Sequence, residues 1–219
     1  MTEAPVTGET ASQPSGGYPI NVTYDRNQQL NQLWGIPLLG IMARAILAIP
    51  HFIILWGYGI VVGLVTLITW YPVLTRGEYP RWGFEIVGGY LRWLIRVQAY
   101  VSLMADPYPP FTNRAGGYPV DVTFAEPAQL NALWGIPLLG IVARAILAIP
   151  HFIILWVLGI VVGVVFLISW FPVLTTGRFP GWGYDIIGGT TRWSTRVTAW
   201  IMLMADPYPP FSLDNPPRS

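Results

Sequence analysis

Apolar residues form one very long run in each half of the chain. From Gly35 to Leu74 the run contains no charged residue or histidine apart from Arg44 and His51. A helix of about forty residues at ~1.5 Å per residue would be about 60 Å long, twice the ~30 Å hydrocarbon core of a bilayer. One straight helix is therefore excluded, and Pro50, which removes a backbone donor, supplies the break. We expect a short helix over 37–49 and a spanning helix over 51–71.

A second apolar segment follows a polar hairpin over 72–83 and predicts a helix over 84–104. It carries Glu85, Arg92 and Arg96 at a spacing that puts all three on one stripe of the helix. Such a helix can lie at the membrane interface with its arginines at headgroup level. Alternatively it spans the bilayer, where each arginine costs ~2.5–3.5 kcal/mol unless it is paired or snorkels.

Shorter polar segments flank these helices. Pro19 to Tyr24 alternates apolar and polar residues, which predicts a short strand. The segment from Asp106 to Phe111 contains three prolines, so it forms an extended end that cannot continue a helix.

The whole pattern occurs twice, because residues 18–111 align with residues 118–211 without insertion or deletion. A repeat of this kind determines the architecture of the chain. We divide the sequence into an N-terminal tail, a first membrane repeat, a linker, a second membrane repeat and a C-terminal tail, at 1–17, 18–111, 112–117, 118–211 and 212–219. The first tail is polar, lacks the features of a signal peptide and is expected to be disordered.

Two similar repeats favour an even number of membrane crossings in each, because an odd number would invert the second copy despite its identical arginines. We therefore expect an all-α integral membrane protein of two tandem parallel repeats, each with about two spanning helices and one short interfacial or re-entrant helix. Arg26 and Arg44 lie on the N-terminal side of the first span. Their position predicts a multi-pass protein of the cell membrane with both termini in the cytoplasm.

Composition supports a membrane protein and excludes several other classes. Hydrophobic residues make up 53% of the chain and charged residues 11%, against roughly 25% charged in soluble domains. A net charge of +1 gives no electrostatic basis for binding nucleic acid. There is no cysteine, and we find no nucleophile elbow, HExxH motif or phosphate-binding glycine loop. We expect no cofactor, no metal site and no enzymatic activity.

Charges within the helices are the same in both copies, whereas loop charges differ, as at Glu78 and Arg178. Arginine suits phosphate or carboxylate because its planar fork makes two-point contacts. The candidates for contact with a ligand or lipid headgroup are therefore Arg44, His51, Arg92, Arg96 and Asp106, with their counterparts Arg144, His151, Arg192, Arg196 and Asp206.

Two interpretations of these residues remain open. Six helix arginines outnumber four retained acids, which favours an external anionic partner for a cationic cluster of Arg44, Arg92 and Arg96. Alternatively, the arginines pair in part with Glu85 and Asp106 and otherwise snorkel, and the histidines satisfy local carbonyls. Small residues four apart predict close helix packing at Gly59, Gly63, Gly159 and Gly163, although this spacing is also common by chance in apolar helices.

Three strings resemble the bacterial membrane-protein family catalogued as domain of unknown function 4389: Arg44-Ala-Ile-Leu-Ala-Ile-Pro-His51, Arg92-Trp-Leu-Ile-Arg-Val-Gln-Ala-Tyr100 and Asp106-Pro-Tyr-Pro-Pro-Phe111. Two tandem copies would cover nearly all of 18–211, with Trp200 in place of Tyr100 in the second. The resemblance implies an integral membrane protein and supplies no activity.

We therefore expect a non-enzymatic scaffold or accessory subunit. Its predicted partners are the lipid bilayer, an anionic phospholipid, and a membrane-protein complex or homo-oligomer, contacted through the arginine face. The alternative is a small transporter or channel with a polar path lined by the helix arginines. An enzyme that acts on lipid through His51 is the third hypothesis.

Overall fold

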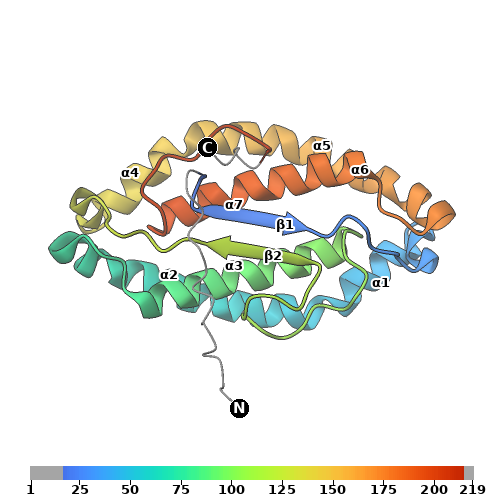
Figure 1. Ribbon diagram of the computed structural model, residues 1–219, viewed down its shortest axis with the longest axis horizontal. Coiled ribbons are helices and arrows are strands. Elements are labelled where there is room, and N and C mark those ends of the chain that lie inside the picture. The colour runs from blue at the N-terminus through green and yellow to red at the C-terminus, as the bar shows by residue number, and fades with distance from the viewer. Residues whose placement is uncertain (1–16, 215–219) are drawn as a thin grey trace, which may run out of the picture.

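The computed structural model describes residues 17–214 and is mostly helical, at 63% helix (Figure 1). The first repeat consists of β1 (Ile20–Tyr24), the 3-10 turn η1 (Gln32–Gly35), α1 (Leu39–Leu47), α2 (Ile49–Arg76) and α3 (Arg81–Val101). The second consists of β2 (Val120–Phe124), η2 (Ala132–Gly135), α4 (Leu139–Leu147), α5 (Ile149–Thr176), α6 (Gly181–Gly183), the π-helical η3 (Tyr184–Gly188) and α7 (Gly189–Ile201). Residues 1–16 and 215–219, which hold most of the two predicted tails, lie outside the described residues.

The predicted break in the long apolar run is confirmed. Helix α1 ends and α2 begins at Ala48, and Pro50 lies in the first turn of α2, where its missing N–H costs no helical hydrogen bond. Helix α2 runs past the predicted end at Tyr71 to Arg76 and accommodates Pro72. Gly77 then ends it at a φ of 67°, a left-handed conformation that glycine adopts without a Cβ clash.

The two repeats are related by a two-fold axis. Strands β1 and β2, both predicted from alternation, pair antiparallel with Val22 facing Val122. Because these two valines are equivalent in the repeats, the axis passes between them. Figure 1 shows the consequence: α2 and α5 lie on opposite sides of the molecule and run in opposite directions, with the sheet between them.

The two strands therefore run antiparallel, while the predicted parallel orientation of the two repeats in the membrane stays a prediction. A lone strand would leave its backbone N–H and C=O groups unpaired, and each repeat contributes a single strand. Antiparallel pairing satisfies these groups at the shared edge and reverses the second repeat relative to the first. Because it contains this sheet, the fold is mostly helical and not the all-α fold that the sequence predicted.

The N-terminal segment of each repeat packs on the other repeat. The backbone N–H of Leu30 donates to the carbonyl of Gly177 at 2.7 Å, and Leu130 donates to Gly77 at the same distance. Gly35 lies so close to α5 that a Cβ there would be 2.2 Å from the backbone nitrogen of Leu174. The equivalent contact of Gly135 with Leu74 has the same distance. The repeats therefore interlock through backbone contacts that only glycine permits.

The four glycines predicted to pack helices together behave differently. Within residues 17–214, no atom outside the local helix lies within 4 Å of a Cβ built at Gly63, Gly159 or Gly163. Gly59 faces only the ring and hydroxyl of Tyr90, at 3.4 Å. Three of the four glycines thus make no contact with another helix within the described chain, while Gly59 of α2 lies against Tyr90 of α3.

The helices divide into an inner and an outer pair. Helices α3 and α7 bury most of their residues, while α2 and α5 expose most of theirs. In the described chain, α2 and α5 are the two helices long and apolar enough to cross a membrane. The structure thus has one such helix per repeat, where the sequence predicted about two. The second predicted spanning helix, α3, does not qualify because it carries charges and packs against the sheet.

The close contact at Gly35 yields a testable prediction. Gly35→Ala should lower the free energy of unfolding by about 1–3 kcal/mol, because the new methyl group overlaps the backbone of α5. Gly63→Ala is the matched control, since its Cβ enters open space and alanine favours a helix by about 1 kcal/mol over glycine. Thermal unfolding of the purified variants in detergent measures both. Equal melting temperatures for the two variants would contradict the contact.

Candidate functional site

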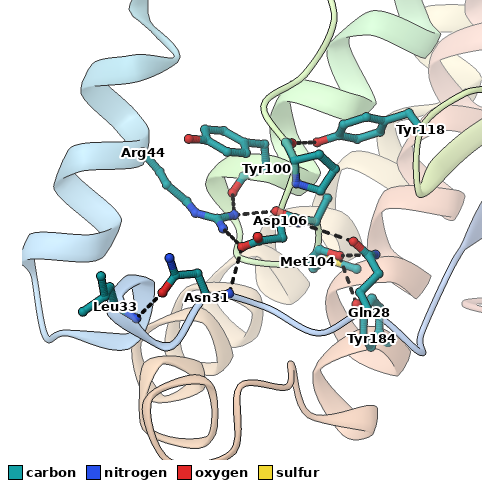
Figure 2. Close-up of polar contacts among 11 residues, drawn as sticks. Gln28, Asn31, Leu33, Arg44, Tyr100, Met104, Asp106, Tyr118 and Tyr184 are labelled. Atoms are coloured by element: carbon teal, nitrogen blue, oxygen red, sulfur yellow. Dashed lines mark hydrogen bonds and ion pairs between the residues drawn. The ribbon is translucent and has the colours of Figure 1, made fainter.

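Arg44 lies at the centre of a buried polar network at the end of α3 (Figure 2). Its Nη1 donates to the carbonyls of Tyr100 at 2.7 Å and Ala105 at 2.5 Å, and its Nη2 donates to Asp106 Oδ1 at 2.9 Å. The guanidinium carbon also lies 4.8 Å from the ring centroid of Trp34 and 4.5 Å from that of Tyr100. A cation placed at the carboxyl end of a helix is favoured by the helix dipole. Arg44 thus joins α1 to the end of α3.

The same network extends through Asp106 to the polar segment before α1. Asp106 Oδ1 accepts from the backbone N–H of Asn31 at 3.1 Å, and Gln28 donates to the carbonyl of Met104 at 3.2 Å. Figure 2 also shows the second repeat reaching in, where the hydroxyl of Tyr184 donates to Met104 at 3.0 Å and that of Tyr118 donates to Pro107 at 2.9 Å. Both repeats therefore hold the loop between α3 and β2.

The second repeat builds an equivalent site. Arg144 donates to the carbonyls of Trp200 and Ala205 and to Asp206, at 2.5, 2.7 and 3.2 Å. Its guanidinium lies 4.7 Å from Trp134 and 4.8 Å from Trp200. Trp200 replaces Tyr100 and keeps an aromatic ring against the cation, which explains why this position tolerates the difference between the copies.

Both of these arginines are buried yet remain protonated. Burial lowers the pKa of Arg44, opposed by Tyr100 and Asp106. Burial likewise lowers the pKa of Arg144 to about 10, opposed by Asp206. A pKa near 10 lies well above neutral pH, so the charge is present when the ion pair forms. The side chains of Arg44 and Arg144 are 0% exposed, and they have no surface with which to contact a lipid headgroup.

Arg92 and Arg96, the other two predicted arginines of the first repeat, bond to β2 at an outer edge of the shared sheet. Arg92 Nε donates to the carbonyl of Val122 at 2.9 Å, on the strand of the other repeat. Arg96 Nη2 donates to Asp121 Oδ1 at 3.0 Å and to the carbonyl of Gly116 at 3.2 Å. Strand carbonyls at an open sheet edge need donors. Arg92 supplies one, and Arg96 holds the same strand through the side chain of Asp121.

Arg192 and Arg196 do the same at the opposite edge. Arg192 Nε donates to the carbonyl of Val22 at 3.1 Å, and Arg196 Nε donates to that of Ile20 at 3.5 Å. Arg196 Nη2 also donates to the carbonyl of Asp214 at 2.9 Å. We call Arg92, Arg96, Arg192 and Arg196 the edge arginines, since each connects a helix of one repeat to the strand of the other.

His51 is a buried anchor for the proline-rich end of the repeat. Its Nδ1 accepts from the indole N–H of Trp93 at 3.0 Å, and Phe111 stacks on its ring with centroids 4.0 Å apart. Tyr108 lies 4.9 Å away. His151 has equivalent partners at 2.9, 4.0 and 4.9 Å. An indole N–H only donates, so the imidazole Nδ1 that accepts from it carries no proton. The proton of the neutral imidazole therefore lies on Nε2. This Nε2 has no hydrogen-bond partner within residues 17–214.

The predicted single cationic cluster is therefore divided among internal sites. Arg44 serves the end of α3, Arg92 and Arg96 serve the sheet, and the two stripe acids lie apart from both. Glu85 pairs with Arg81 at 3.2 Å, and Asp185 pairs with Arg26 at 2.7 Å, both on the surface. Of the open alternative, in which the helix arginines pair with Glu85 and Asp106, the pair of Asp106 with Arg44 is present, whereas Glu85 pairs with Arg81 outside the predicted cluster.

Some members of these sites escaped the sequence analysis. Trp34 and Trp134 precede the apolar runs in both copies, and that identity was an available signal. Asp121 gave no such signal, because the first repeat has Asn21 at the same position. A comparison of repeats detects only residues that both copies use, so an ion pair present on one side of the axis is missed.

The structure also contains a hollow of about 520 Å³ beside the sheet. Its lining residues are Thr23, Tyr24, Asp25, Gly117, Tyr118, Pro119 and Asp121. Within residues 17–214 there is no group of three or more His, Cys, Asp or Glu residues that could hold a metal ion. Asp121 on the wall of this hollow is already bonded to Arg96.

Comparison with known proteins identifies a family and nothing more specific. The family model described as Domain of unknown function (DUF4389) matches residues 39–113 and again residues 139–212. Each match begins at the short amphipathic helix and ends beyond the proline-rich segment, so the tandem duplication is shown. No curated protein and no solved structure matches the chain.

Removal of the Arg44 side chain should be costly. Arg44→Ala is expected to lower the free energy of unfolding by about 3–5 kcal/mol, because Asp106 and two carbonyls lose their buried cationic partner. Arg81→Ala, in the exposed pair with Glu85, should cost about 0–1 kcal/mol. Denaturant titration in detergent compares the two. Similar losses would show that the Arg44 network is not a structural centre.

A double-mutant cycle tests the histidine anchor. His51→Phe alone should cost about 1–3 kcal/mol, because the buried indole N–H of Trp93 loses its acceptor. Adding Trp93→Phe removes that unpaired donor, so the double variant should be destabilised by less than the sum of the single variants. Additive losses in the same unfolding assay would refute the hydrogen bond as the source of stability.

Proposed function

The chain belongs to this family of unknown function through both repeats, and we propose that it is a non-enzymatic membrane scaffold or accessory subunit. In this proposal α2 and α5 sit in lipid and hold the two-fold core in the membrane. The polar outer face of the shared sheet, with Thr23 and Thr123, is the surface available to a partner.

One observation carries the proposal: the outer helices expose large apolar side chains along their whole length. Trp56 is 75% exposed and Ile53 65% exposed, and Trp156 and Ile153 are 71% and 61% exposed. Soluble monomers rarely expose contiguous apolar patches beyond a few hundred Å². A helix that is apolar over its exposed surface is compatible with lipid, which supports a place for α2 and α5 in the bilayer.

The arrangement of the charged groups favours a scaffold over a transporter or a lipid enzyme. The helix arginines that a polar path would require are bonded to carbonyls and carboxylates of the same chain. His51 is enclosed by Trp93 and Phe111. Groups held in this way stabilise a rigid core, which is the property that a scaffold needs.

Membrane insertion is tested by a charge placed on the outer helix. Leu64→Arg, at a side chain 56% exposed, places a charge on the surface assigned to lipid and should reduce the fraction that resists extraction by alkaline carbonate. Glu78→Arg, in the hairpin after α2, is the control and should extract like the parent chain. A parent chain released into the carbonate supernatant would contradict the proposal, as would equal extraction of the two variants.

The scaffold role is tested by position-specific photocross-linking in native membranes. A photoreactive residue at Thr23, on the polar face of the sheet, should capture a discrete protein adduct, and one at Ile60, on the outer side of α2, should capture lipid. The same protein adduct from both positions, or none from Thr23, would argue against a partner on the sheet.

A further inference from the structure

We propose that both repeats lie in a single leaflet of the membrane, with α2 and α5 along the membrane plane and the shared sheet facing water. This rests on the proposed membrane location and specifies the surface that lipid covers. The partner is therefore one lipid leaflet, which holds the outer helices without being crossed by them.

The two-fold axis relates the outer helices in two orientations of interest, one in which both span the membrane and one in which both lie flat at the same depth. It runs through the Val22–Val122 pair, and α2 and α5 run in opposite directions about it (Figure 1). If the axis lies in the membrane plane and the helices run along the membrane normal, both helices span and the repeats are inverted. If the axis is normal to the membrane, both helices lie flat and the two repeats have the same depth. The positions of the polar groups decide between these orientations.

The polar surface lies beside the middle of the helices. Arg92, near the midpoint of α3, bonds Val122 at the centre of β2. In both strands the residues alternate between buried and accessible positions, and the accessible face carries Asn21, Thr23, Asp121 and Thr123. A spanning orientation would place this polar face at the centre of the hydrocarbon, where polar groups have no water to bond.

The loop after α3 leads to the same conclusion. Asn113 Nδ2 donates to the hydroxyl of Tyr58 in the interior of α2, at 3.4 Å, and the exposed Arg114 follows directly. Residues 115–117 are exposed and contain two glycines with positive φ, which form no helix or strand. Irregular backbone facing lipid does not occur at the depth that a spanning α2 would give this loop. With the axis normal to the membrane, the loop and the sheet both face water.

The apolar surface fits a flat orientation. At ~1.5 Å per residue the 28 residues of α2 span about 42 Å, longer than the ~30 Å hydrocarbon core, and a helix lying in the plane has no such limit. Helix α1 continues the surface with Leu39, Met42 and Ile46, each more than half exposed. The short helix predicted as interfacial and the long helix predicted as spanning thus occupy the same leaflet.

Because the chain has no cysteine, single cysteines report the accessible side directly. Glu78→Cys and Arg178→Cys occupy equivalent exposed positions in the two hairpins, which lie at opposite ends of the long axis because α2 and α5 are antiparallel. Thr23→Cys marks the sheet. Ile60→Cys and Ile160→Cys are matched controls that are exposed in the structure and covered by lipid in the proposal. Each variant of the full chain is treated with a membrane-impermeant maleimide in right-side-out and in inverted membrane vesicles.

We expect Glu78→Cys, Arg178→Cys and Thr23→Cys to react from one and the same side, and the two isoleucine positions to react from neither. Labelling of the two hairpins from opposite sides, or of Thr23→Cys from the side opposite the hairpins, overturns the proposal. Arg76→Cys and Thr176→Cys replace the first pair if either variant fails to accumulate. Carbonate extraction of the same membranes tests the membrane location separately from the single-leaflet orientation. A chain that resists extraction but is labelled from both sides is embedded in the membrane and spans it.

Discussion

The rest of the structure depends on one constraint: each repeat contains a single strand, and a single strand cannot satisfy its own backbone. Pairing β1 with β2 about the Val22–Val122 axis satisfies the shared edge. That pairing reverses one repeat relative to the other, places each N-terminal segment against the other repeat's long helix, and requires glycine at Gly35 and Gly135, where backbone meets backbone. The duplication is thus one interlocked unit and not two units in series.

The arginines follow from the same constraint. A two-stranded sheet has two outer edges, and three of the edge arginines donate to strand carbonyls there from helices of the opposite repeat, while Arg96 donates to Asp121 of β2. Arg44 and Arg144 perform a related task where α3 and α7 end. Buried arginines in an apolar protein therefore organise its backbone, and the exposed residues of the strands are polar, as at Thr23 and Thr123. The outer surfaces of α2 and α5 are left apolar, which is the basis for assigning lipid to them.

Local features of the fold could be predicted from the sequence, while the relation between the repeats could not. The break before Pro50 and the strand after Pro19 follow from backbone chemistry and alternation, and both are present. The antiparallel pairing of the two strands could not be predicted, because charge patterns report only the sidedness of helices that span. At the site, the repeat comparison selected arginines and histidines that the structure holds in internal contacts, but an excess of cations over acids suggested an external anion. Backbone carbonyls, which no count of side-chain charges includes, take that place, as Tyr100 and Val122 do for Arg44 and Arg92.

Disulfide formation across the shared sheet tests the central claim most directly. Residues facing each other in an antiparallel pair have Cα atoms ~4.5–5.5 Å apart, within the range that a disulfide bridges. Asn21 faces Thr123 in this register, so the double variant Asn21→Cys, Thr123→Cys should oxidise within one chain and migrate as a compact monomer without reductant. Thr23→Cys with Thr123→Cys joins equivalent positions that the antiparallel register holds apart, and it should remain reduced under the same conditions. Rapid bridging of the second pair with none in the first would contradict the two-fold pairing.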